Sequence, residues 1–169
     1  MKAVVAILVL FAALGASARG STSAGWCAAG QLSGYFAYVP GSAGAGNVVY
    51  ELDLTNISRT SCRLTGLPRL RLVGLGNRPL PTHVIAAYPG QLTAVLVRLA
   101  PGAAAVATAR FSPDVPGIGE TTIGACEPIA YRLRVTAPGG GTLLAPIAPA
   151  TRVCEHGQMQ LSAYSKAKT

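Results

Sequence analysis

The sequence is poor in the residues that build reactive sites. It holds two histidines, six acidic residues and four cysteines among 169 residues, and charged residues make up 12% of the chain. His83 and His156 stand far apart, and neither a His-Glu-x-x-His motif nor a Cys-x-x-Cys pair, the spacings typical of zinc sites, is present. Aromatic residues make up only 6% and do not alternate with the arginines. We therefore expect no metal, no cofactor and no nucleic-acid partner.

Motifs for nucleophilic catalysis are also lacking. Ser42 lies in the nearest approach to Gly-x-Ser-x-Gly, but proline stands where the first glycine belongs. The glycine-rich segments 44–46 and 139–141 precede no helical pattern, so neither predicts a phosphate-binding loop. Imidazole and thioether both suit copper(I), but Met159, close to His156, begins an alternating apolar segment and is predicted to lie in the core. We expect that the protein is not an enzyme.

The N-terminus has the pattern of a secretory signal peptide. Lys2 is followed by an apolar run over residues 3–14 and by a small Ala-Ser-Ala triplet that suits a signal peptidase. An apolar run of about a dozen residues is too short to cross a bilayer core of roughly 30 Å. No longer apolar run follows it. We expect export, cleavage near Ala18, one domain over residues 19–169 and no membrane span in the mature chain.

Four cysteines in an exported chain predict two disulfides, because the extracellular environment is oxidising. The cysteines are Cys27, Cys62, Cys126 and Cys154. The residues alone permit three pairings and do not choose among them. Trp26, next to the first cysteine, is predicted to pack over the first disulfide because few aromatic residues are available to the core, with exposure at the mature N-terminus as the alternative.

Period-two alternation dominates the rest of the chain. In the strand predicted over residues 48–55, apolar residues such as Tyr50 and Leu52 fall on one face, and Glu51 and Asp53 fall on the other. Segments rich in glycine and proline separate the alternating runs and supply turns. These features predict an all-β, antiparallel two-sheet sandwich of seven or more strands, with a closed barrel as the alternative. The further strands are predicted over residues 32–39, 69–72, 92–99, 104–111, 131–136, 142–147 and 159–164.

Several segments together resemble a known family. Cys27, the glycine-rich loop 41–47 and the run Cys-Arg-Leu-Thr-Gly-Leu-Pro over residues 62–68 are similar to those of the secreted actinobacterial proteins of the domain of unknown function 4232. Later parts agree, namely the Pro-Gly at 101–102 before an alanine-rich strand and the Val-Cys pair at 153–154. The resemblance covers about residues 27–164 of this chain.

Similarity to that family implies an immunoglobulin-like β-sandwich and export. It also implies disulfides between Cys27 and Cys62 and between Cys126 and Cys154. It implies no activity, because the family has none assigned. Asn56 is predicted to hydrogen-bond the neighbouring backbone where a strand turns a corner, which is a structural role.

The excess of basic residues is the feature that points to a partner. Lys and Arg total 14 against six acidic residues, for a net charge of +8, and most of the cations are arginine, which binds phosphate and carboxylate oxygens in pairs. Arg69, Arg71, Arg132 and Arg134 alternate with apolar residues on two predicted strands. An anionic cell-envelope polymer, a lipid headgroup and an acidic protein are conceivable partners, and a solvated arginine surface with no partner is the interpretation that this composition favours.

These observations favour a non-enzymatic secreted module that binds or assists at the bacterial cell envelope or in the medium. One alternative is an envelope glycan hydrolase that uses Glu51 and Asp53, which project from one strand face about 6.5 to 7 Å apart. A hydrolytic pair needs a groove and two different carboxyl environments, so we interpret this face as solvated or paired with the four arginines above. A second alternative is a purely structural surface protein.

Overall fold

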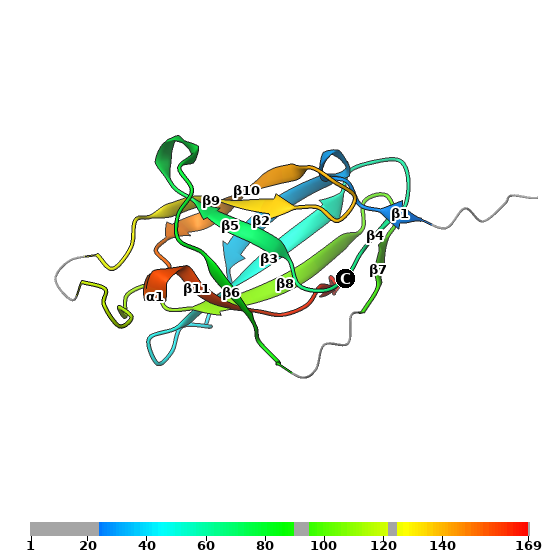
Figure 1. Ribbon diagram of the computed structural model, residues 1–169. Helices are drawn as coiled ribbons and strands as arrows, with labels where there is room; N and C mark the ends of the chain where they lie inside the picture. The colour runs from blue at the N-terminus through cyan, green and yellow to red at the C-terminus, as the bar shows by residue number, and fades with distance from the viewer. Residues whose placement is uncertain (1–23, 90–94, 122–124, 169) are drawn as a thin grey trace, which may run out of the picture.

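The computed structural model describes residues 24–89, 95–121 and 125–168 (Figure 1). The predicted signal peptide and its cleavage point near Ala18 lie outside the described residues. Residues 92–94 of the strand predicted over 92–99 lie outside them too.

Short strands make up most of the described chain. The strands predicted from alternation all have a counterpart among the described residues, which confirms the all-β prediction. Four further strands, β1, β4, β6 and β12, are two to four residues long, too short to display an alternating pattern. The strands are β1 (Gly25–Trp26), β2 (Leu32–Tyr38), β3 (Val48–Asn56), β4 (Cys62–Leu64), β5 (Arg69–Val73), β6 (His83–Ala86), β7 (Val97–Leu99), β8 (Ala104–Phe111), β9 (Ala130–Thr136), β10 (Thr142–Thr151), β11 (Gln158–Leu161) and β12 (Ser165–Lys166). The helical elements of the described residues are the 3₁₀ turns η1 (Ala29–Gln31) and η2 (Leu75–Asn77) and the single turn α1 (Cys154–Gly157).

The strands form one large sheet and one small sheet. The large sheet has the order β5-β9-β10-β2-β3-β8-β11-β6, with β12 also paired to β8, and the small sheet has the order β1-β4-β7. Most neighbours are antiparallel, as predicted. The pairs β1–β4, β10–β2 and β11–β6 are parallel, a feature that hydrophobic alternation cannot reveal because it is the same in both orientations.

The large sheet folds over, so that its first strands cover its last ones. In Figure 1, β5, β9 and β10 lie above β3, β8 and β11. Strand β5 is hydrogen-bonded to the connection that leads into β6, because the Leu80 N–H donates to the Leu72 carbonyl at 3.0 Å and the Leu72 N–H donates to Thr82 Oγ1 at 2.9 Å. The result is a sandwich-like, all-β fold.

The core lies between these layers and follows the alternation of the sequence. Tyr50 and Leu52 of β3 are buried as predicted, and the small Ala107 of β8 faces the same interior. Tyr50 packs between two other rings, with centroid distances of 5.2 Å to Phe36 and 5.2 Å to Phe111. Burying each such apolar side chain stabilises the fold by about 1.5 to 3 kcal/mol.

Two disulfides join Cys27 to Cys62 and Cys126 to Cys154, which confirms the pairing implied by the family resemblance. They indicate an oxidising environment for the folded protein. The first ties the chain ahead of β2 to the small sheet, and the second ties the segment between β8 and β9 to α1. Among the described residues, no helix combines the length and apolar character that a membrane span requires.

The predicted role of Asn56 as a corner residue is confirmed. Its buried side chain donates to the Thr60 carbonyl at 2.8 Å and to the Leu99 carbonyl at 3.1 Å, and its Oδ1 accepts the Ser58 N–H at 3.0 Å. These bonds hold the end of β3 against the small sheet, so Asn56 acts as a structural residue.

Candidate functional site

The four predicted arginines lie together on one surface, here called the arginine face, made of Arg69, Arg71, Arg132 and Arg134. Strands β5 and β9 are antiparallel neighbours in which Arg71 lies directly opposite Arg134. The residues between the arginines, Leu70 and Leu72 on β5 and Leu133 and Val135 on β9, belong to or pack against the core. Because side chains alternate across a strand, the four guanidinium groups point away from the core.

Like charges face each other on this surface. Side chains directly opposite on antiparallel strands have Cβ atoms about 4.5 to 5.5 Å apart, so Arg71 and Arg134 repel each other. Among the described residues, no salt bridge involves an arginine of this face. Arg132 instead donates from Nη1 to Asn77 Oδ1 at 3.0 Å.

The surroundings of the arginine face contain no carboxylate on the next strand. On β10, Leu144 lies opposite Arg134 and Pro146 lies opposite Arg132. A hollow of about 490 Å³ at the η2 end is lined by Arg132 and Asn77. A second hollow of about 310 Å³ at the other end is lined by Arg69 and Tyr164. The face is therefore an open, basic surface with a shallow hollow at each end.

The acidic pair Glu51 and Asp53 lies elsewhere, on the outward side of β3. Opposite them are Thr108 and Val106 on β8. Of the two surroundings predicted for these carboxylates, solvent or pairing with Arg69, Arg71, Arg132 and Arg134 across strands, the pairing is wrong. Strands β10 and β2 separate β9 from β3, so cross-strand contact between the two sets is not available.

A surface hollow of about 530 Å³ is lined by Glu51, Asp53, Lys166 and Lys168. Both carboxylates are half-buried, and the Asp53 side chain accepts a hydrogen bond from Thr55 Oγ1 at 2.9 Å. A glycoside hydrolase needs one carboxyl group in a less polar place than the other. Two similar positions beside lysines do not favour that chemistry.

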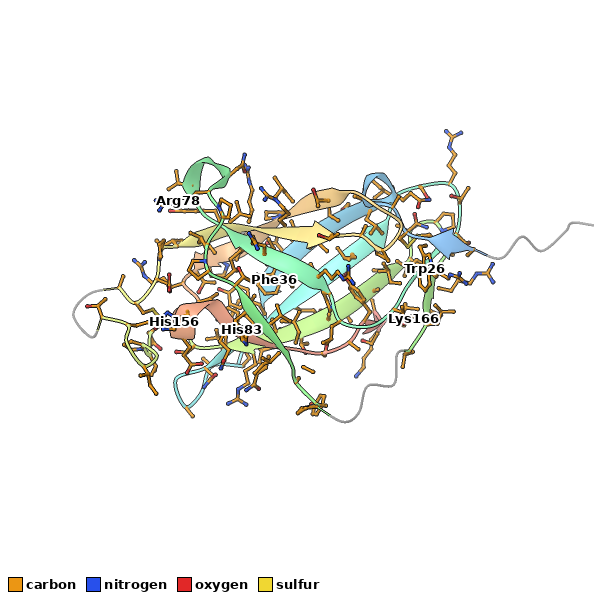
Figure 2. All side chains as sticks on the ribbon, viewed as in Figure 1. Trp26, Phe36, Arg78, His83, His156 and Lys166 are labelled. Atoms are coloured by element: carbon orange, nitrogen blue, oxygen red, sulfur yellow. A yellow bond between two sulfur atoms is a disulfide. The ribbon has the colours of Figure 1, made fainter. Side chains whose placement is uncertain are left out.

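A second charged cluster, the Glu–His cluster, consists of Glu120, Glu127 and His156, which no motif in the sequence predicts. His156 Nδ1 lies 3.6 Å from Glu120 Oε1 and 3.9 Å from Glu127 Oε1. One donor atom from each of the three side chains lies within 4.8 Å of the other two. Figure 2 shows His156 at the opposite end of the molecule from Trp26.

The backbone of α1 is shaped around Glu120. Glu155 and His156 have φ angles of 56° and 57°, in the left-handed region that non-glycine residues rarely adopt. Their two N–H groups point at the Glu120 carboxylate, which also accepts the Gly117 N–H at 2.6 Å. Only 2% of the Glu120 side chain is exposed. Such a turn of successive N–H groups forms a small concave anion site, and Glu120 fills it.

The two carboxyl groups of the cluster have opposite pKa shifts. Burial raises the pKa of Glu120, but the N–H groups of His156, Gly117 and Glu155 outweigh burial and hold its pKa below the ordinary glutamate value. Burial raises the pKa of Glu127, and the negative charge of Glu120 raises it further, while His156 opposes the rise. Glu120 is therefore the more acidic member of the pair.

The disulfide pairing is the signal that could have revealed this cluster. Glu127 directly follows Cys126, and Glu155 and His156 directly follow Cys154. The Cα atoms of these two cysteines lie 5.5 Å apart, so a bridge between them places Glu127 near His156. Glu120 has no comparable signal. It lies in the irregular connection between β8 and β9, where no periodic pattern predicts a contact with α1.

The other residues weighed in the sequence have structural surroundings. Met159 is fully buried in β11, whereas the His156 side chain is 62% exposed, so they do not form a copper pair. Ser42 Oγ accepts the Val49 N–H at 3.0 Å and donates to the Val49 carbonyl at 3.2 Å, which secures a loop.

Trp26 is less buried than predicted. It is 41% exposed, and the guanidinium carbon of Arg63 lies 4.3 Å from its ring centroid. The indole therefore packs against an arginine at the edge of the small sheet rather than being enclosed in the core.

Comparison with protein families identifies the chain over most of its length. The model of the family described as "Domain of unknown function (DUF4232)" matches residues 27–165, which confirms the resemblance found over residues 27–164. No curated protein matches the chain.

Proposed function

The chain belongs to the DUF4232 family, a domain of unknown function. We propose that it is a non-enzymatic secreted module that binds an anionic polymer of the bacterial cell envelope. Its predicted signal peptide and its two disulfides support export to an oxidising compartment. The arginine face is the observation on which the proposal depends.

The geometry of the arginine face suits a repeated anion better than a single small one. The side chains along each strand stand about 6.5 to 7 Å apart, and the opposite pair on β5 and β9 stands closer. The four arginines therefore form a staggered row, with the opposite pair Arg71 and Arg134 at its centre, Arg69 at one end and Arg132 at the other, rather than the lining of one deep pocket. Phosphate or carboxylate groups repeated along a polymer would each meet a separate arginine.

The energetics of the face favour the same partner. Repulsion between Arg71 and Arg134 raises the free energy of the unbound face, and a bound anion between them removes that repulsion. Leu144 and Pro146 on the adjoining strand are exposed and carry no charge that could compete for the guanidinium groups.

The proposal is tested with long-chain polyphosphate as the probe and a matched charge control. A variant with Arg69, Arg71, Arg132 and Arg134 all replaced by Gln should bind polyphosphate at least about tenfold more weakly than the wild type. A control variant replaces four other exposed cations by Gln, namely Arg59, Arg98, Arg110 and Lys166. It has the same net charge as the first variant and should retain most of the binding.

Salt and probe chemistry complete the test. Raising the salt concentration should weaken wild-type binding, because screening acts strongly on exposed charges. Equal losses in both variants would mean that net charge alone drives binding and would overturn the proposal. Binding to anionic lipid vesicles or to polyglutamate but not to polyphosphate would assign the face to a lipid surface or an acidic protein instead. No binding to any probe would leave a purely structural surface protein.

A further inference from the structure

The Glu–His cluster has the composition and placement of a metal site. Its side chains come from two chain segments that the Cys126–Cys154 disulfide holds together. Two carboxylate oxygens and one imidazole nitrogen converge from different directions, with the Nδ1–O distances of 3.6 and 3.9 Å given above. Neither distance is a hydrogen bond.

The contact of the second ring nitrogen of His156 indicates which neutral tautomer fits the geometry. His156 Nε2 lies 3.1 Å from the Ile118 carbonyl oxygen. A carbonyl oxygen only accepts, so Nε2 carries a hydrogen and donates it. In the neutral ring, Nδ1 then presents a lone pair, and that lone pair faces the oxygens of Glu120 and Glu127. Histidines that bind metals typically donate their other N–H to a backbone carbonyl in this way.

We infer that Glu120, Glu127 and His156 bind a divalent first-row transition-metal ion, with Zn²⁺ as the best match. A mixed set of carboxylate and imidazole donors suits zinc, whereas Ca²⁺ and Mg²⁺ prefer oxygen ligands alone. Three protein donors leave one position of a tetrahedral ion for water, on the side where His156 is open to solvent.

The cluster needs little rearrangement to close on an ion. Donor atoms at about 2.0 to 2.2 Å from a tetrahedral ion lie roughly 3.3 to 3.5 Å from one another. The two nitrogen–oxygen distances must therefore shrink by a few tenths of an ångström. The exposed His156 ring can make this shift. Glu120 is held by three N–H groups and stays in place, so it anchors the site.

The experiment uses the purified exported chain with both disulfides intact and without an affinity tag. Titration with Zn²⁺ in a calorimeter should give one ion per chain. Titration with Co²⁺ should give a visible absorption band of tetrahedral type with no thiolate band. Zn²⁺ should also raise the melting temperature, because an ion that binds only the folded state stabilises it.

Two variants each replace one metal-binding side chain and leave Glu120 in place. Glu127→Gln and His156→Asn should each weaken Zn²⁺ binding at least about tenfold. Asn is chosen at position 156 because it tolerates the left-handed conformation. The matched control is His83→Asn, at the exposed histidine of β6, and it should bind Zn²⁺ as the wild type does.

Each other outcome would overturn the inference. No Zn²⁺ binding by the wild type means that no metal site exists. An equal loss in His83→Asn means that binding is adventitious. Binding that requires reduction of the disulfides means that the thiolates of Cys126 and Cys154, which lie beside Glu120, hold the metal instead. Circular dichroism of each variant separates lost ligands from lost folding.

Discussion

The arginine face and the Glu–His cluster place charge in opposite ways. The arginine face lies on two regular strands, and the pleat alone directs its side chains into solvent. The Glu–His cluster is built from irregular segments on both sides of a disulfide, and its central carboxylate, Glu120, is almost completely buried. In this protein strands β5 and β9 display positive charge, whereas the crosslinked loops enclose negative charge. The two regions should therefore respond differently to the same kind of change.

The largest expected difference follows from removing one disulfide at a time. Replacing Cys126 and Cys154 by Ala should lower the free energy of unfolding by about 3 to 4 kcal/mol, because the unfolded chain loses a loop constraint. The same change should abolish Zn²⁺ binding, since Glu127 and His156 are no longer held together, and should leave polyphosphate binding to the arginine face unchanged. Urea unfolding and the two titrations measure these effects.

The first disulfide is the control for this comparison. Replacing Cys27 and Cys62 by Ala opens a loop of similar length, 35 residues against 28, so the loss of stability should be similar. Zn²⁺ binding should survive in this variant, measured at a temperature where it remains folded. If Zn²⁺ binding is lost equally in both variants, the second disulfide has no specific part in building the cluster.

A smaller effect distinguishes the two carboxyl groups within the cluster. Glu120→Gln should cost about 1 to 3 kcal/mol at pH 7, because hydrogen bonds to an ionised group are replaced by weaker ones. The pKa of Glu120 is lower in the folded state than in the unfolded state, so its carboxylate stabilises the fold above the unfolded value of about 4.3. That stability is lost as the pH falls through the folded pKa. The difference between variant and wild type should therefore shrink in urea unfolding below about pH 4.

Glu127→Gln should not lower the free energy of unfolding at pH 7, in contrast to Glu120→Gln. The pKa of Glu127 is raised in the folded state, so its contribution to stability is present when it is protonated and is lost as the pH rises above the unfolded value. The neutral amide should therefore leave the metal-free protein as stable as the wild type, or slightly more stable, at pH 7. A large loss of stability in this variant at pH 7 would contradict the assigned direction of the shift.

The same contrast explains how much of the molecule could be predicted from its sequence. Strands such as β3 and β9 were predictable because burial on one face imposes a period of two, and that period also directed Arg69, Arg71, Arg132 and Arg134 outward. The neighbours of each strand were not predictable, since alternation does not specify which strands pair. The wrong assignment of Glu51 and Asp53 to arginine partners follows from this gap.

The Glu–His cluster shows the other limit of sequence reasoning. The left-handed turn at Glu155 and His156 has no composition that predicts it, because only the following Gly157 is a residue that adopts this conformation freely. Gly157 itself is required by a close approach, since a Cβ there would lie 2.1 Å from the Pro81 carbonyl oxygen. Tertiary contacts with the β5–β6 connection therefore fix the turn, and a local reading of the chain does not contain them.

The smallest expected effect lies on the arginine face, where one substitution should raise the free energy of unfolding and weaken polyphosphate binding. Arg71→Gln removes the repulsion with Arg134, so it should raise the free energy of unfolding by a few tenths of a kcal/mol at low salt. The gain should disappear at high salt, where the repulsion is screened. The same substitution should weaken polyphosphate binding.

Arg98→Gln is a useful comparison, because Arg98 lies opposite Arg63 in the small sheet and also faces a like charge, yet lies outside the arginine face. It should relieve repulsion in the same way without weakening polyphosphate binding. A stability gain together with a binding loss in Arg71→Gln alone would mean that the arginine face keeps an unfavourable charge pair that only a bound anion resolves.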